Sequence, residues 1–150
     1  MPPAVHTESP MLRDERVRKH LAQAREYWLK CPACLAEGDL CQAGEKGWRA
    51  FAQMTKAVAS HRGWRHFGHA EILASARQVA DESNDPGAIR DGMEVARTMH
   101  ANFYEVDLDR IAVERGLARV ESLLQTFWLL LPERYTGGLS FFNWLAEADP

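Results

Sequence analysis

His100 is the residue whose type and position most clearly suggest chemistry. It interrupts a stripe of apolar residues at helical spacing, formed by Ile89, Met93, Ala96 and Phe103. A buried imidazole needs a hydrogen-bond partner, so His100 is either a satisfied core histidine or part of a polar pocket. In the second interpretation, His100 acts as a general acid or base toward a ribose 2′-hydroxyl. Its expected neighbours in that pocket are Glu45, Asn102 and Tyr104.

Two basic residues, Arg97 and Lys46, could assist His100 in such a site. Arg97 lies one helical turn before it and could hold a phosphate through two parallel hydrogen bonds. Glu45 and Lys46 belong to a separate amphipathic stretch that we expect to pack across from His100. Glu45 also stands four residues before Arg49, a spacing that suits a solvated ion pair without any function.

A second candidate site is the basic stretch of residues 56–69. It contains no acid, and its charged or titratable side chains are Lys56, His61, Arg62, Arg65, His66 and His69. Aromatic residues lie among them at Trp64 and Phe67, so the stretch could contact backbone phosphates and stack on a base. The alternative is a solvated, flexible loop. We predict RNA or nucleotide contacts for Arg62, Arg65 and His69.

The three cysteines raise the question of a metal site. Cys31 and Cys34 have the C-x-x-C spacing that forms half of a zinc site, with Cys41 nearby. The fourth ligand would have to be a histidine from elsewhere, and Cys31 falls on an apolar stripe. Buried, reduced thiols are therefore the favoured interpretation, and we predict no metal site.

The elements that must position these residues are helices. Ser9 followed by Pro10, Asp39 followed by Gln42, and Asp85 followed by Pro86 are typical helix starts. They predict three helices. The first begins at residue 10 and either continues through Pro32 with a kink or divides there into two shorter helices. The second covers residues 39 to about 61, and the third begins at residue 86. A shorter helix is expected over residues 69–82, and Asp107 is expected to cap a last one that ends before Pro132. No stretch alternates with period two, so the fold class is an all-α antiparallel bundle of about five helices.

The chain length and composition indicate one domain. With 150 residues and a net charge of −3, the chain can bury a single core. We expect a flexible tail over residues 1–8, the bundle over residues 9–132, and an aromatic-rich segment over residues 133–150 that docks on the bundle or on a partner. No membrane span, secretory signal or cofactor motif is evident, so we predict a cytoplasmic protein without a cofactor. Gly44 and Gly47 weaken a helix, which suggests close helix packing or a dimer contact.

Two stretches carry a resemblance to a known family. They are GDLCQAGEKGWRAFAQMTKAVA, residues 38–59, and MHANFYE, residues 99–105. Together they resemble the archaeal PaREP-type families, which are placed in the HEPN superfamily of small helical bundles. The resemblance covers roughly residues 21–131. It implies an HEPN-like bundle, a homodimer, and RNA or nucleotide chemistry in toxin–antitoxin pairs, with a cognate nucleotidyltransferase or antitoxin as partner.

The chain departs from the pattern of active HEPN ribonucleases. Those enzymes resemble one another in an arginine, four to six intervening residues, and a histidine. The positions that should hold arginine before His100 are Met93, Glu94 and Val95. A literal match joins Arg62 to His69, but it lies in a different connection. The first hypothesis is therefore a binding module for RNA, a nucleotide or a partner protein. The alternatives are a metal-independent ribonuclease, using Arg97 with His100 or Arg62 with His69, and a structural interaction protein.

Overall fold

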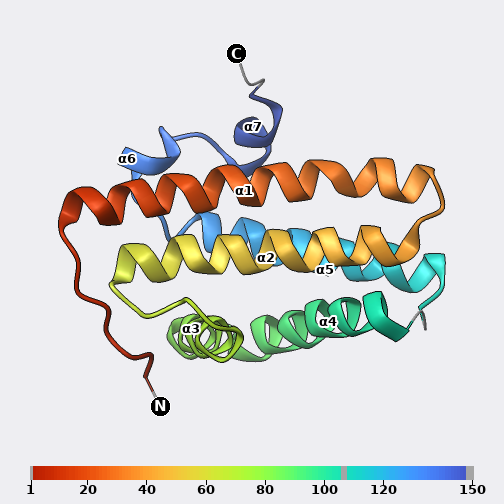
Figure 1. The fold of residues 1–150 in the computed structure, drawn as a ribbon, viewed down its shortest axis with the longest axis horizontal. Helices are drawn as coiled ribbons and strands as arrows, with labels where there is room; N and C mark the ends of the chain where they lie inside the picture. The colour runs from red at the N-terminus through yellow and green to blue at the C-terminus, as the bar shows by residue number, and fades with distance from the viewer. Residues whose placement is uncertain (1, 106–107, 148–150) are drawn as a thin grey trace.

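The chain folds into a bundle of five long helices with two short helices at its C-terminal end (Figure 1). The computed structural model describes residues 2–105 and 108–147, with the backbone alone for residues 102–105. The helices are α1 (Pro10–Ala36), α2 (Leu40–Arg62), α3 (His69–Glu82), α4 (Pro86–Glu105), α5 (Arg110–Trp128), α6 (Glu133–Thr136) and α7 (Phe141–Ala146). The predicted all-α fold class is confirmed. No helix in the described ranges has the length and apolarity needed to cross a membrane.

Side-chain caps mark the starts of α1, α2, α4 and α5. The side chain of Ser9 accepts a hydrogen bond from the backbone N–H of Leu12 and starts α1, and Asp39 accepts from Gln42 and starts α2. These caps satisfy backbone donors that have no partner within the helix. Both starts agree with the sequence prediction. For α5 the cap is Asp109, whereas the predicted cap, Asp107, lies outside the described residues.

Helix α1 continues through Pro32 as a single element. A proline inside a helix removes one backbone hydrogen bond and crowds the preceding turn. Pro32 is exposed, in the last turns of α1, and the apolar stripe continues on both sides of it through buried Cys31 and half-buried Leu35. Packing of that stripe holds the helix together, so the alternative of two short helices is wrong.

Helix α2 is the centre of the bundle and packs against α1, α4 and α5. Its apolar face is fully buried at Phe51, Met54 and Val58. The close approach of the neighbouring helices depends on glycine, because a Cβ atom at Gly47 would lie 2.5 Å from Leu117 Cδ2. At Gly44 it would lie 3.3 Å from Met99 Cβ. Both glycines therefore serve close packing within one chain.

The C-terminal segment lies along one side of the bundle, beside α1 and α5 (Figure 1). The rings of Trp128 in α5 and Trp144 in α7 stack with centroids 4.4 Å apart. The Trp128 Nε1–H donates a hydrogen bond to the carbonyl of Leu139 at 2.9 Å. Phe141 and Trp144 are buried, whereas Phe142 is exposed. Burial of two of its large rings explains why this segment is so apolar.

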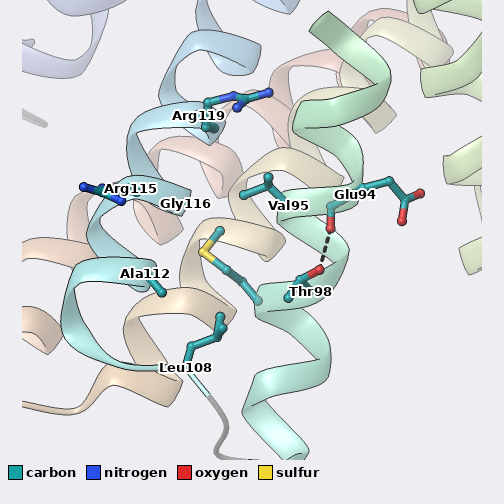
Figure 2. A pocket seen from close by; sticks show the side chains of 9 residues that line it. Glu94, Val95, Thr98, Leu108, Ala112, Arg115, Gly116 and Arg119 are labelled. Atoms are coloured by element: carbon teal, nitrogen blue, oxygen red, sulfur yellow. Dashed lines mark hydrogen bonds between the residues drawn. The ribbon is translucent and has the colours of Figure 1, made fainter. Parts of the chain in front are cut away.

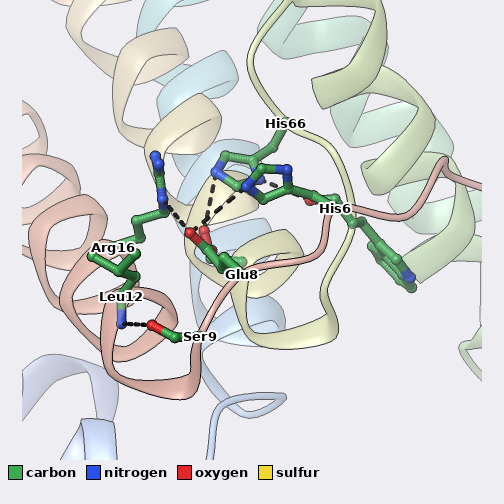
Figure 3. A network of polar contacts seen from close by, with 8 residues as sticks. His6, Glu8, Ser9, Leu12, Arg16 and His66 are labelled. Carbon is green, nitrogen blue, oxygen red and sulfur yellow. Dashed lines mark hydrogen bonds and ion pairs between the residues drawn. The ribbon is translucent and has the colours of Figure 1, made fainter.

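The segment before α1, for which the sequence suggested a loose tail, pairs with the connection between α2 and α3. The His6 N–H donates to the Gly63 carbonyl, and the Arg65 N–H donates to the Ala4 carbonyl, both at 2.7 Å. Glu8 accepts a hydrogen bond from Arg16 Nε at 2.7 Å and lies 3.6 Å from His6 Nε2 (Figure 3). The segment thus lies over the end of α2, where it covers the side chain of His66.

Candidate functional site

Glu45 of α2 and His100 of α4 meet across the bundle, as the sequence analysis expected. His100 Nδ1 lies 2.9 Å from Glu45 Oε2 and 3.2 Å from Oε1. The carboxylate side chain is 3% exposed, while the imidazole is 31% exposed. Burial of a carboxylate requires hydrogen-bond partners, and Glu45 also accepts one from Arg49 Nε at 3.2 Å. Glu45 is therefore a buried hydrogen-bond partner of a histidine whose ring is partly exposed.

Rings on both neighbouring helices hold the imidazole of His100. Trp48, one turn of α2 from Glu45, stacks on it with centroids 5.1 Å apart and an interplanar angle of 28°. His69, the first residue of α3, lies 6.0 Å from His100 and 5.4 Å from Trp48. Because a carboxylate accepts a proton, its contact with Nδ1 favours the tautomer in which Nδ1 carries the proton. Glu45 and the flanking rings of Trp48 and His69 therefore help to set the orientation of His100.

A polar pocket opens beside this histidine, between the start of α3 and α4. Its volume is about 340 Å³, and its lining consists of His69, Glu94, Arg97, Thr98, His100 and Ala101. Arg97 Nη1 donates to Glu94 Oε1 at 3.0 Å on the outer side of the pocket. Burial, followed by the positive charges of His100 and Arg97, lowers the pKa of His69. Two imidazoles and one guanidinium therefore share one pocket, which we call the His69–His100 pocket.

Among the other residues expected at this site, Lys46 lies elsewhere. The ammonium group of Lys46 lies over the ring of Tyr27 in α1, 5.6 Å from its centroid. Arg49 also approaches Tyr27, and a hydrogen bond to that side chain raises the pKa of Arg49, with Glu45 contributing less. The side chains of Asn102 and Tyr104 lie outside the described residues. Of the expected group, Glu45, Arg97 and His100 come together.

The basic stretch of residues 56–69 is largely neutralised by acids of the following helix. Arg62 forms an ion pair with Glu82 at 2.8 Å, and Arg65 forms one with Glu71 at 2.8 Å. These ion pairs lower the pKa of both carboxyls. Both arginines of this stretch are therefore paired, because α3 folds back and brings its acids against the preceding connection.

The histidine in the middle of that stretch points inward. His66 is 1% exposed, with Nδ1 2.8 Å from the Trp64 carbonyl and Nε2 3.1 Å from Ser60 Oγ. Its ring lies 5.4 Å from that of His20 in α1. Residues 61–69 therefore do not form one basic site: Arg62 pairs with α3, while His69 joins the pocket beside His100.

His20 is a buried polar residue that the sequence analysis did not single out. It follows Arg13 with six residues between them, which is another match to the arginine–histidine spacing of the HEPN ribonucleases. His20 Nδ1 lies 2.8 Å from Gln53 Oε1, and burial lowers the pKa of the ring to about 4. A neutral ring enclosed between α1 and α2 suits a structural role.

The three cysteines are free thiols. Cys31 Sγ donates weakly to the Tyr27 carbonyl at 3.7 Å, and burial raises the pKa of this thiol to about 12. Within residues 2–105 and 108–147, no three histidine, cysteine or acidic side chains are grouped so that they could hold a metal ion.

These features define an all-α helical bundle protein with a polar pocket where α3 and α4 meet beside α2. The model of the archaeal PaREP1/PaREP8 family matches residues 19–124, which is more than half of the sequence. The chain belongs to the archaeal PaREP1/PaREP8 family. The matched range extends from α1 into α5 and includes the His69–His100 pocket. Comparisons with curated proteins and with solved structures give no match.

Proposed function

We propose that this protein is an HEPN-like RNA- or nucleotide-binding module whose His69–His100 pocket holds a phosphate group. The observation that carries the proposal is the shared pocket of His69, Arg97 and His100, with His100 supported by buried Glu45. Guanidinium and protonated imidazole groups donate strong hydrogen bonds to phosphate oxygens. A binding site gains from donors that are already oriented, and Glu45 and Trp48 orient the ring of His100.

Binding without turnover is the simpler function for this pocket. Active HEPN ribonucleases have an arginine before the histidine, with four to six residues between them; here Glu94 and its two neighbours occupy those positions. Arg97 is closer to His100 in sequence and is engaged by Glu94. A phosphate that enters the pocket can compete for the guanidinium of Arg97, because this ion pair lies at the surface and is weak.

Fluorescence anisotropy with a labelled twelve-nucleotide single-stranded RNA tests this proposal. The matched variants are Arg97→Gln and Arg90→Gln, which remove two arginines of α4 that each pair with one surface acid. We expect Arg97→Gln to weaken binding about tenfold, the effect of losing a charge-assisted hydrogen bond of roughly 1.5 kcal/mol. Arg90→Gln should leave the affinity unchanged.

Salt dependence provides a second readout of the same contact. For single-stranded RNA, the slope of log K against log salt concentration is about −0.7 for each phosphate neutralised. Arg97→Gln should therefore make the slope shallower by roughly one phosphate. RNA binding that does not depend on salt, or equal losses in the Arg97→Gln and Arg90→Gln variants, would refute the proposal.

A metal-independent ribonuclease is the second candidate, favoured by the presence of two imidazoles in one pocket. One ring would take the proton of a ribose 2′-hydroxyl as its oxygen attacks phosphorus, and the other would protonate the departing 5′-oxygen. The product would be a 2′,3′-cyclic phosphate. Cleavage that is lost in both His100→Ala and His69→Ala, while both variants stay folded, would support the enzyme. Unchanged cleavage in both variants would identify a contaminating nuclease.

The family resemblance also motivates a homodimer and a toxin–antitoxin context, which we include in the proposal. Light scattering on the purified protein at several concentrations tests the dimer. Co-expression with the product of any adjacent nucleotidyltransferase or antitoxin gene, followed by purification through one partner, tests the complex. A monomer at all concentrations, or no co-purification, would remove the respective part of the proposal.

A further inference from the structure

A second pocket lies between α4 and α5 (Figure 2). Its volume is about 340 Å³, and its lining consists of Glu94, Val95, Thr98, Met99, Leu108, Ala112, Arg115, Gly116 and Arg119. Glu94 and Thr98 also line the His69–His100 pocket, but the histidines do not reach this one. We call it the α4–α5 pocket.

The floor of the α4–α5 pocket is apolar, and it includes a glycine of α5 against which side chains of α4 pack. A Cβ atom at Gly116 would lie 2.8 Å from Met99 Sδ and 3.4 Å from Val95 Cγ1. The glycine lets α5 approach α4 closely and leaves Ala112 and Leu108 to complete the floor. Such an opening, flanked by aliphatic and thioether groups, suits a planar ring better than a hydrated ion.

Two arginines of α5 also line this pocket, and no described residue neutralises their charge. Arg115 and Arg119 are exposed, lie four residues apart on one face of α5, and form no ion pair with a described residue. Two acids of the same helices are already engaged, Glu94 with an arginine of α4 at 3.0 Å and Glu114 with an arginine of α5 at 3.1 Å. Two guanidinium groups are thus available to an oxyanion at the edge of an apolar floor.

We propose that the α4–α5 pocket is a separate binding site for a small molecule in which a planar ring carries an oxyanion, as in a nucleoside monophosphate or an aromatic carboxylate. The ring packs on the floor formed by Met99 and Ala112, and the oxyanion accepts hydrogen bonds from Arg115 or Arg119. Arginine suits this task because its planar group can donate two parallel hydrogen bonds to a phosphate or carboxylate. The site does not depend on phosphate binding in the His69–His100 pocket.

Isothermal titration calorimetry with four probes tests the chemistry of the ligand. The probes are adenosine monophosphate, 2-naphthoate, adenosine and inorganic phosphate. We expect adenosine monophosphate or 2-naphthoate to bind. The one that binds more tightly shows whether the ligand is a nucleotide or an aromatic carboxylate. Adenosine and phosphate should each bind at least about tenfold more weakly, since each lacks one of the two parts. Absence of binding by both ring-bearing anions at millimolar concentration would overturn the proposal.

Variants assign the binding to this pocket. The Arg115→Gln/Arg119→Gln double variant should weaken binding at least about tenfold, whereas Arg77→Gln, which removes an exposed arginine of α3, should not. Ala112→Phe should abolish binding because the larger side chain occupies the space above the apolar floor. If this variant fails to fold, the Arg115→Gln/Arg119→Gln variant, whose changes are at the surface, still tests the site. Unchanged affinity in the Arg115→Gln/Arg119→Gln variant, or an equal loss in Arg77→Gln, would refute the site.

A last variant separates this inference from the proposed function. The His69→Asn/Arg97→Gln double variant removes two donors of the His69–His100 pocket and should retain the binding of the ring-bearing anion. Loss of that binding would move the ligand to the His69–His100 pocket and would overturn the α4–α5 pocket as its site.

Discussion

Protonation of His20 should couple the stability of the bundle to pH. The ring is 9% exposed between α1 and α2, with Nδ1 2.8 Å from Gln53 Oε1. Its Nε2 is buried without a hydrogen-bond partner in the described part of the chain. Burial lowers the pKa from 6.5 to about 4, against the opposing effect of the hydrogen bond to Gln53. The folded protein therefore favours the neutral ring.

The direction and size of the effect follow from this pKa difference. Between pH 6.5 and 4 the unfolded chain binds a proton at His20 that the folded chain does not, so the free energy of unfolding falls as the pH is lowered. At about 1.4 kcal/mol per pKa unit, the complete loss is about 3 kcal/mol. Above pH 6.5 this contribution to stability is fully present.

Urea unfolding followed by tryptophan fluorescence at pH 7.5, 6.0, 5.0 and 4.5 measures this loss. In His20→Gln, the fall in unfolding free energy between pH 7.5 and 4.5 should be smaller than in the unmodified protein by about 2–3 kcal/mol. His69→Gln, which changes an exposed residue, serves as the control. Its unfolding free energy should still decrease between pH 7.5 and 4.5 by most of the amount seen in the unmodified protein. An identical pH dependence in His20→Gln and the unmodified protein, or an NMR titration of His20 near pH 6.5, would refute the reasoning.

Three further predictions concern packing and the phosphate site. Gly47→Ala should destabilise the protein by about 1–2 kcal/mol in urea unfolding, because overlap with Leu117 outweighs the gain in helix propensity. Gly87→Ala should not, because a Cβ there would make only an ordinary contact with Asp85 Oδ1 at 3.8 Å. An unchanged stability of Gly47→Ala would show that α5 moves freely away from α2. Trp144→Ala should cost about 3 kcal/mol through the lost stacking on Trp128, and a near-neutral value would mean that α7 is only loosely attached. RNA affinity should rise as the pH falls from 6.5 to 5.5, because burial lowers the pKa of His69 below 6.5 and this ring gains most of its charge in that range; anisotropy that does not vary with pH there would contradict its role.

Helix boundaries were readable from the sequence because they depend on local chemistry. The Ser9 and Asp39 caps, and the proline that starts α4, act within one turn of the backbone. The apolar stripes also identified the buried faces, as at Phe51 and Met54 of α2. The start of α5 was missed by two residues because Asp107 and Asp109 are equally suitable caps in sequence.

The electrostatics of the surface could not be read in the same way. Residues 56–69 contain no acid, yet Arg62 and Arg65 are paired with Glu82 and Glu71. Those acids follow in the next helix, and only the turn between α2 and α3 brings them back. His66 likewise becomes buried because the segment before α1 lies against the same turn.

The sequence by itself determined the helices, their order and their buried faces, since each depends on residues within a few positions of one another. It also identified Glu45 and His100 as candidates, because both belong to the stretches that resemble the PaREP-type families. Only the tertiary structure decided that these two residues, 55 positions apart, share a hydrogen bond at 2.9 Å. It also decided that Arg115 and Arg119 border an apolar pocket. Such contacts depend on how α2, α4 and α5 cross, and the crossing is set by glycines whose effect appears only when the helices pack.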